Sequence, residues 1–148
     1  MVFLGEFEAS VDSKNRFLLP AGLRKQLPEG ETKLVLCRGL DKCLLLYPSK
    51  AWEDITNKLL KLNDFDPKVR LFKTTFLGGA TEIELDTAGR VLLPQSLKGH
   101  AEIDRDIMIV CDLDKIKIWN TAKYKEFFEN NTSQSLSDLA KEIGYSSN

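Results

Sequence analysis

A chain of 148 residues with a formal net charge of −1 has room for one ordinary domain or two small ones. Hydrophobic residues form 43% of it, which is enough for a core, and charged residues at 29% favour a soluble surface. No stretch of about 18 apolar residues occurs, which argues against a membrane-spanning helix, and the opening MVFLGEFEAS lacks the basic start of a signal peptide. We therefore expect a cytoplasmic protein.

The first predicted elements are two short strands joined by a tight turn. Apolar residues alternate with polar ones over residues 7–11, a pattern typical of a half-buried strand. A turn at 12–16 leads into a second apolar stretch that ends at Pro20. One or two helical turns are predicted next, around Leu23.

Two longer strands and a helix complete the first half. Apolar runs at 33–39 and 43–48 predict the strands, and the residues between them, 40–42, form a turn. Apolar residues at helical spacing predict a helix from 49 to about 62, with Ser49 as its N-cap.

A separate helix is predicted between the two halves, over residues 66–79. Asp66 is typical of an N-cap and Pro67 of the first helical position. The apolar face of this helix consists of Val69, Phe72 and Phe76. The glycine pair at 78–79 ends it.

The second half repeats the pattern of the first. DSKNRFLLP at 12–20 and DTAGRVLLP at 86–94 share Asp, Arg and Leu-Leu-Pro at equivalent places, 74 residues apart. The same series of strands follows, and a helix is predicted from Thr121, as its N-cap, to about residue 130. The Ser-rich tail from 132 permits either a short helix or a mobile end.

These patterns divide the chain into a first repeat at 1–65, a connecting helix at 66–79, a second repeat at 80–131 and a C-terminal tail at 132–148. A repeat of about 70 residues buries limited apolar surface on its own. We therefore expect one β-rich, barrel-like body built from both copies around a pseudo-two-fold axis, with both turns on one side.

The repeated turn admits two interpretations, of which the first is structural. Asp12 and Asp86 can accept hydrogen bonds from N–H groups of their own turns. Arg16 and Arg90 follow four residues later, within reach of those carboxylates. In this interpretation the turn is a clasp that binds nothing, which is the commoner case for a single charged turn.

In the second interpretation the turn presents basic groups to a ligand. Residues 10–27 carry a net charge of +3, four basic and one acidic, whereas the equivalent residues 84–101 carry zero. Asn15 and Gly89 hold equivalent places and tolerate the positive φ of a tight turn, and arginine offers paired donors to phosphate or guanine. The candidate DNA-binding residues are Lys14, Asn15, Arg16, Arg24, Lys25 and Arg90, while Asp12, Asp86 and Gly89 structure the turns.

Neither metal nor catalytic chemistry is indicated. The three cysteines lie in apolar runs and match no zinc spacing, so we interpret Cys37, Cys43 and Cys111 as small buried hydrophobic residues. His100 is the only histidine and falls in a predicted solvated turn. Nucleophile-elbow, Walker and Rossmann motifs are absent. We expect no enzyme, no cofactor, no metal and no small-molecule substrate.

The segments DSKNRFLLPAGLR and DTAGRVLLP, with the opening FLGEFEASVD, resemble the MraZ family of bacterial proteins, within the wider AbrB-like swapped-hairpin class of DNA binders. The match covers nearly all of residues 1–143, with both copies in order. The resemblance implies an α+β, β-rich fold in which two tandem AbrB-like repeats form a pseudo-two-fold, double-psi-like barrel with peripheral helices. One position departs from the family pattern: Asn15 stands where Gly is usual, which Asn tolerates at some backbone cost.

The resemblance also implies a function. It indicates a sequence-specific, DNA-binding transcription regulator, associated with the nucleoid, that acts on tandem boxes in the promoter of the division and cell-wall gene cluster. It further implies ring-shaped homo-oligomers, octamers or dodecamers. Asp12 with Arg16, and Asp86 with Arg90, match the family's Asp-x-x-x-Arg positions, and Arg24 matches its basic residue after Leu-Pro-Ala.

An alternative stays open, a protein-binding assembly scaffold of the same fold that does not bind DNA. Steeply salt-dependent retention on DNA or heparin would separate the two functions. In either case aromatic residues such as Phe65 and Phe76 are candidates for ring contacts, although the core is the commoner place for Phe.

Overall fold

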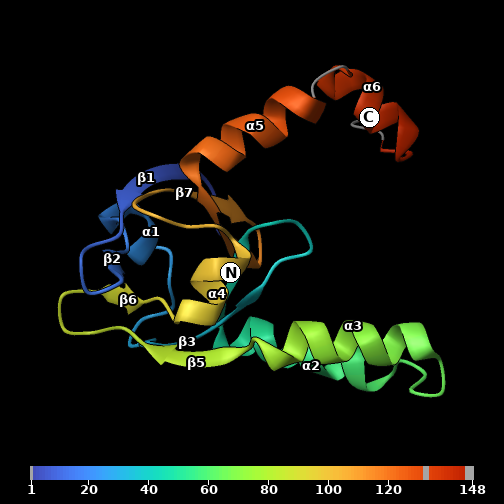
Figure 1. Ribbon diagram of the computed structural model, residues 1–148, viewed down its shortest axis with the longest axis horizontal. Helices are drawn as coiled ribbons and strands as arrows, with labels where there is room; N and C mark the ends of the chain where they lie inside the picture. Colours follow the sequence, from blue (N-terminus) through green and yellow to red (C-terminus); the bar gives the residue numbers. More distant parts are fainter. Residues whose placement is uncertain (1, 132–133, 146–148) are drawn as a thin grey trace.

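The computed structural model describes residues 2–131 and 134–145 (Figure 1). Each half contains the predicted series of strand, strand, short helix, strand, strand and helix. In chain order the elements are β1 (Glu6–Ser10), β2 (Arg16–Leu18), α1 (Ala21–Arg24), β3 (Lys33–Arg38), β4 (Leu44–Pro48), α2 (Ser49–Leu60), α3 (Pro67–Gly78), β5 (Thr81–Glu84), β6 (Arg90–Leu92), α4 (Gln95–His100), β7 (Asp106–Asp112), β8 (Lys115–Asn120), α5 (Thr121–Asn131) and α6 (Leu136–Glu142).

The main sheet has six strands, and its order reflects the repeat. The order is β1-β7-β8-β4-β3-β5, with every neighbouring pair antiparallel. Exchanging each strand for its counterpart in the other repeat reverses this order and leaves it otherwise unchanged. The first strand of each repeat therefore pairs with the other repeat, β1 with β7 and β5 with β3. Because the repeats exchange strands, each completes the sheet of the other.

A second, two-stranded sheet of β2 and β6 places the two turns side by side. Phe17 lies opposite Val91 in the antiparallel register. Two backbone hydrogen bonds extend the pairing, from Leu19 N–H to Gly89 O at 3.0 Å and from Leu93 N–H to Asn15 O at 2.8 Å. These two bonds are related by the repeat, so a pseudo-two-fold axis passes between β2 and β6.

Strand pairing does not close the main sheet into a barrel. Its outer strands are β1 and β5, which pair on one side only in the described structure. The fold is therefore α+β with an open, antiparallel sheet, and the predicted closed barrel is not confirmed.

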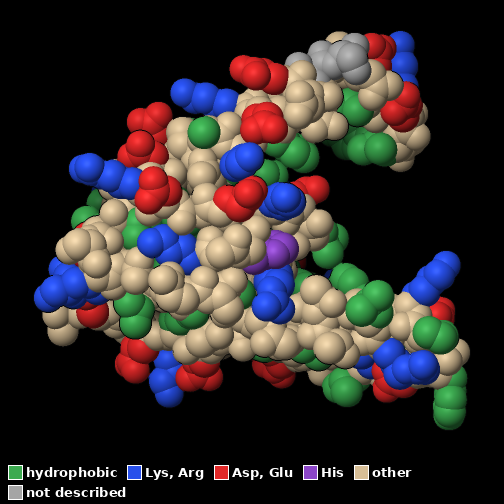
Figure 2. All heavy atoms as spheres, viewed as in Figure 1, with side chains coloured by type: hydrophobic (Ala, Val, Ile, Leu, Met, Phe, Trp, Pro, Cys, Tyr) green, Lys and Arg blue, Asp and Glu red, His purple; other side chains and the backbone are tan. Residues whose placement is uncertain are grey.

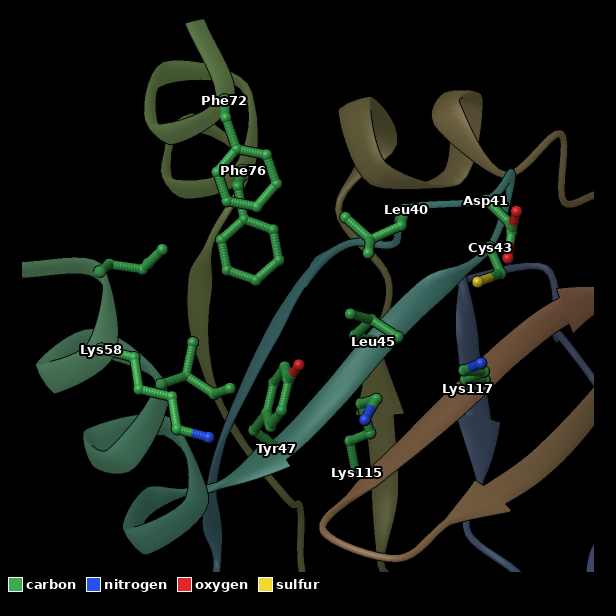
Figure 3. A pocket seen from close by; sticks show the side chains of 12 residues that line it. Leu40, Asp41, Cys43, Leu45, Tyr47, Lys58, Phe72, Phe76, Lys115 and Lys117 are labelled. Atoms are coloured by element: carbon green, nitrogen blue, oxygen red, sulfur yellow. The ribbon is translucent and has the colours of Figure 1, made fainter. Parts of the chain in front are cut away.

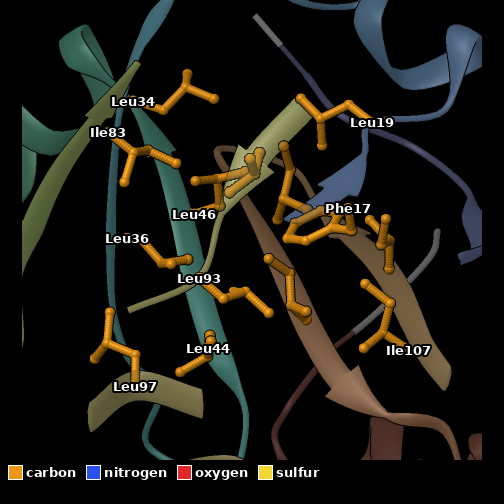
Figure 4. Packing of buried hydrophobic residues seen from close by; sticks show 14 of the residues in the cluster. Phe17, Leu19, Leu34, Leu36, Leu44, Leu46, Ile83, Leu93, Leu97 and Ile107 are labelled. Carbon is orange, nitrogen blue, oxygen red and sulfur yellow. The ribbon is translucent and has the colours of Figure 1, made fainter. Parts of the chain in front are cut away.

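The interior core is shared between the repeats. Leu34 and Leu36 from β3 lie in the same buried cluster as Leu93 after β6 and Ile107 of β7. Figure 4 shows these side chains directed into one interior space from both halves. Phe17 is 1% exposed there. Because neither half encloses this cluster alone, the expectation that the two copies need each other agrees with the packing.

The outer face of the central strands carries a second apolar cluster beneath α2 and α3. Leu45 and Tyr47 of β4 belong to it, whereas Leu44 and Leu46 belong to the interior core. Strand β4 is thus buried on both faces, which explains its continuous apolar sequence. Tyr47 packs against Trp52 of α2, with ring centroids 5.7 Å apart.

Two predicted cysteine positions are confirmed as hydrophobic core. Cys37 and Cys43 are buried, and Cys111 is half-buried. Burial raises the pKa of the Cys37 thiol to about 12 and that of Cys43 to about 11. Both thiols therefore stay protonated at neutral pH, as inert packing groups.

Two predicted helix caps are shifted by one residue. Pro48, not Ser49, occupies the N-cap position of α2, and the Ser49 hydroxyl donates to the Glu31 carboxylate at 3.0 Å. At α5 the side chain of Asn120, not Thr121, accepts the N–H of Ala122 at 2.9 Å. Asn is as good a cap as Ser or Thr, so composition alone could not choose between neighbours.

The connecting helix and the tail follow the predictions more closely. The Asp66 side chain caps α3 by accepting the Lys68 N–H at 2.9 Å. The tail forms the short helix α6, capped by Ser135, while residues 132–133 and 146–148 lie outside the described part. His100 ends helix α4 instead of lying in a turn. Of the two aromatic residues considered for ring contacts, Phe65 is 92% exposed but Phe76 is core.

No helix in the described part of the chain combines the length and apolar character needed to cross a membrane.

Candidate nucleic-acid interface

The first turn is organised by the carboxylate of Asp12. Its Oδ1 accepts the backbone N–H groups of Lys14 and Arg16, both at 2.9 Å. Its Oδ2 accepts the side-chain Nε–H of Arg16 at 3.1 Å. Asn15 supplies the required positive φ of 62°. One carboxylate therefore fixes both the backbone of the turn and the direction of the arginine.

The second turn repeats this geometry. Asp86 Oδ1 accepts the N–H groups of Ala88 at 3.0 Å and Arg90 at 2.8 Å. Asp86 Oδ2 accepts Arg90 Nε–H at 2.7 Å, and Gly89 has a φ of 84°. The predicted roles of Asp and Gly in structuring the turns agree with these contacts.

The two carboxylates are tuned to stay ionised. Backbone hydrogen bonds from Arg16 lower the pKa of Asp12, and its ion pair with Arg16 adds to the effect. Backbone hydrogen bonds from Arg90 lower the pKa of Asp86 in the same way. Each turn therefore keeps its negative charge, and its clasp, well into acid.

The arginines retain donors for a ligand. Each uses its Nε–H for its own aspartate, and among the described residues the terminal guanidinium nitrogens of Arg16 and Arg90 have no protein acceptor. The side chains are 28% and 37% exposed. An arginine held at Nε with both terminal nitrogens available is oriented for paired hydrogen bonds to phosphate or to a guanine edge.

The first turn carries more free positive charge than the second. Lys14 and Lys25 are exposed and form no ion pair within the described part of the chain. Their counterparts in the second repeat are the uncharged Ala88 and Gly99. Both turns project from the end of the molecule opposite to α3 and α6 (Figure 1), and Figure 2 shows Lys and Arg side chains gathered at that end.

Arg24 is placed differently from the other candidates, because it reaches across to the second turn. Its Nη1 donates to the carbonyl of Ala88 at 3.3 Å. Its side chain lies over Gly89, where an added Cβ would come 2.7 Å from Nη1. Part of its donor capacity is therefore spent within the protein.

Lys98, which the sequence analysis did not select, is the counterpart of Arg24 in the second repeat. It reaches across to the first turn, where its Nζ donates to the Asn15 side-chain oxygen at 2.7 Å. The signal was present in the sequence, because Lys98 follows Arg24 by the same 74 residues that separate the turns. Each turn is thus held by its own aspartate and by one basic residue of the other repeat.

This cross-repeat contact explains the unusual residue at position 15. Gly89 has no space for a side chain because Arg24 lies over it. At the equivalent place Asn15 fills the space with an amide that accepts the shorter Lys98 bond. Asn is also among the residues that adopt positive φ most readily after Gly.

No group of three or more potential metal ligands gathers within residues 2–131 and 134–145.

These features define a class, a β-rich protein of two strand-exchanged repeats that displays a pair of Asp-x-x-x-Arg turns. Within that class the chain belongs to the MraZ family, whose model, "MraZ protein", matches residues 2–75 and again 76–143. The predicted resemblance is confirmed.

Similar curated proteins span the whole chain. A protein of Clostridium tetani is 36% identical over 144 residues, covering 97% of this chain and 99% of its own length. Proteins of Cytophaga hutchinsonii, 35% identical over 89% of this chain and 88% of their relative, and of Thiobacillus denitrificans, 41% identical over 84% of both, are also similar. All three carry the name Transcriptional regulator MraZ, so the family is one of transcription regulators, which is not an enzyme class.

Proposed function

We propose that the protein is a sequence-specific, DNA-binding transcription regulator that acts in the cytoplasm on the nucleoid. It binds repeated boxes upstream of the division and cell-wall gene cluster as a ring-like homo-oligomer. The observation that carries the proposal is the first turn, in which Asp12 fixes Arg16 with its terminal nitrogens available and with Lys14 beside it. Its fixed direction lowers the entropy lost when a base edge is bound.

The proposed contact set consists of Lys14, Asn15, Arg16, Arg24, Lys25 and Arg90. The resemblance suggests the two repeats form a double AbrB-like barrel, a proposal that the shared core supports. The boundaries at 1–65, 66–79, 80–131 and 132–148 are proposed with it. Duplex DNA contacts would then lie on one end of this body and leave the helices at the other end for self-association.

Several protomers are needed for tight binding. Four basic residues per protomer give a salt slope of about −3.6, and specific binding in the nanomolar range usually needs more contacts. A ring, of eight or twelve subunits by the family resemblance, that faces tandem boxes supplies a high effective concentration for each later contact.

The decisive experiment is selection of bound duplexes from a random pool with the purified protein at two salt concentrations. Enrichment of a short repeated box, with affinity that falls steeply with salt, is the expected result. Failure to enrich any box, together with salt-independent retention, would overturn the proposal and favour the scaffold without DNA.

Arg16→Ala should weaken binding to the selected duplex by about 1–3 kcal/mol for each engaged site, the value of a bidentate base contact. Arg90→Ala is the matched control, because both changes break the same Asp–Arg clasp. Gel shifts on proteins of verified fold give the two affinities. We expect a smaller loss for Arg90, because its turn lacks a lysine. Unchanged affinity in Arg16→Ala would remove this residue from the interface, and a larger loss in Arg90→Ala would move the interface to the second turn.

A further inference from the structure

The face of the molecule away from the turns contains an apolar groove of about 360 Å³ between β4 and the α2–α3 hairpin. Its walls include Leu45 and Tyr47 of β4, Ile55 and Leu59 of α2, and Phe72 and Phe76 of α3. Figure 3 shows the two phenylalanine rings and Tyr47 facing the same space. Phe72 is 40% exposed, so the groove offers apolar surface to a partner.

The same molecule has an apolar helix face without a partner, on α6. Leu136, Leu139 and Ile143 follow each other at spacings of three and four residues, which places them on one side of the helix. Leu136 is 86% and Ile143 79% exposed. A helix of seven residues gains too little from its own hydrogen bonds to be stable in water. Its apolar face therefore calls for a docking surface.

The charges beside the groove and beside the apolar face of α6 are complementary. Lys58 borders the groove and forms no ion pair within the described residues, whereas Lys115 and Lys117 are already paired with Asp112. In Figure 3 the Lys58 nitrogen points toward Tyr47. On α6, Asp138 lies next to the apolar stripe, and its carboxylate has no partner among the described residues.

Groove and helix lie on two separate arms of one protomer. The α2–α3 hairpin and the α5–α6 segment project from the same side of the sheet, with open space between them (Figure 1). Figure 2 shows hydrophobic side chains on the facing sides of both arms. In this arrangement α6 does not fill the groove of its own chain.

We propose that α6 of one protomer docks into the α2–α3 groove of a second copy, with Leu136, Leu139 and Ile143 as anchors and Asp138 facing Lys58. Anchors at this spacing are the usual way in which an amphipathic helix occupies a groove. The inference deepens the ring proposed above by assigning its contact. Each copy has one helix and one groove, so the contact is head-to-tail and closes a ring when the rotation allows it.

The test uses one full-length variant on each side of the contact. Leu139→Glu places a carboxylate on the anchoring face of α6, and Phe72→Glu places one in the groove. Each variant alone should be monomeric by sedimentation velocity, because the buried charge opposes docking. An equimolar mixture should form dimers and nothing larger, since Leu139→Glu keeps a working groove and Phe72→Glu keeps a working helix. Leu71→Glu, at a 70% exposed position outside the groove, is the matched control and should assemble as the wild type does.

A charge reversal protects the test against a folding defect at Phe72. Lys58→Glu and Asp138→Lys should each weaken assembly about threefold, as expected for an exposed ion pair, and the double variant should recover. A monomeric wild type, assembly unchanged by Leu139→Glu and by both reversals, or a mixture without dimers would overturn the proposal.

The outcome separates this contact from DNA binding. Leu139→Glu that is monomeric but still binds a selected duplex weakly supports both proposals. A wild type that assembles through α6 but selects no duplex overturns the regulator alone.

Discussion

At the scale of single residues, Gly89 is the position where the two repeats constrain each other most directly. Its φ of 84° is unfavourable for a residue with a side chain, and Arg24 leaves no room for a Cβ. Gly89→Ala should lower the free energy of unfolding by about 1–2 kcal/mol from backbone strain alone. It should also displace Arg24 from the Ala88 carbonyl. Urea denaturation gives the change in stability.

A double-mutant cycle separates strain from the clash. In an Arg24→Ala background, Gly89→Ala should cost less than in the wild type, because the space above the glycine is then open. Asn15→Gly is the mirror control. It relieves a strained φ and loses the Lys98 bond, so its net effect should be within about 0.5 kcal/mol of zero, as for changes in which small terms oppose each other. Equal costs of Gly89→Ala in the two backgrounds would contradict the packing argument.

At the scale of the structural element, each turn depends on an ionised aspartate. The folded state lowers the pKa of Asp12 and Asp86, so each contributes stability that is present above the ordinary value of 3.8. That contribution is lost as pH falls through the lowered, folded-state pKa. Asp12→Asn and Asp86→Asn should therefore be less stable than the wild type at pH 7 and should lose less stability on acidification. Urea unfolding at pH 7 and pH 3 measures both effects.

Asp54→Asn provides the control for these turn variants. Asp54 pairs with Lys50 on the exposed face of α2 at 3.5 Å, a surface contact of small value. Its removal should leave stability at both pH values almost unchanged. If Asp54→Asn altered the acid limb as much as Asp12→Asn, the turns would not be the groups that the acid limb reports.

At the scale of the whole molecule, the repeat in the sequence predicted more than the individual motifs did. The offset between Asp12 and Asp86 predicted the series of elements and the paired turns, because the same local pattern folds in the same way twice. It did not predict that β1 pairs with β7, since pairing between distant strands is set by tertiary packing. Lys98 was missed for a related reason: a lysine on a short helix has no special pattern until the strand exchange brings it to Asn15.

Strand exchange makes a strong prediction about unfolding. Four strand pairs join the two repeats, β1–β7, β3–β5, β2–β6 and β4–β8. Neither repeat can unfold without breaking the sheet of the other, so the two halves should unfold in one cooperative step. The chain has two tryptophans, Trp52 on α2 of the first repeat and Trp119 on β8 of the second. Each reports on its own half.

Trp52→Phe and Trp119→Phe leave one reporter each, and Leu139→Glu in the same chain removes the concentration dependence that assembly adds to stability. In each variant the urea transition seen by fluorescence should coincide with the transition seen by far-UV circular dichroism. The midpoints of the two variants can differ, because each loses an aromatic contact, Trp52 with Phe76 or Trp119 with Phe127. Two separate transitions within one variant would mean that the halves fold independently. Exchange of β1 and β5 would then contribute little to stability, and the rigid spacing of the two turns would have to come from β2 and β6 alone.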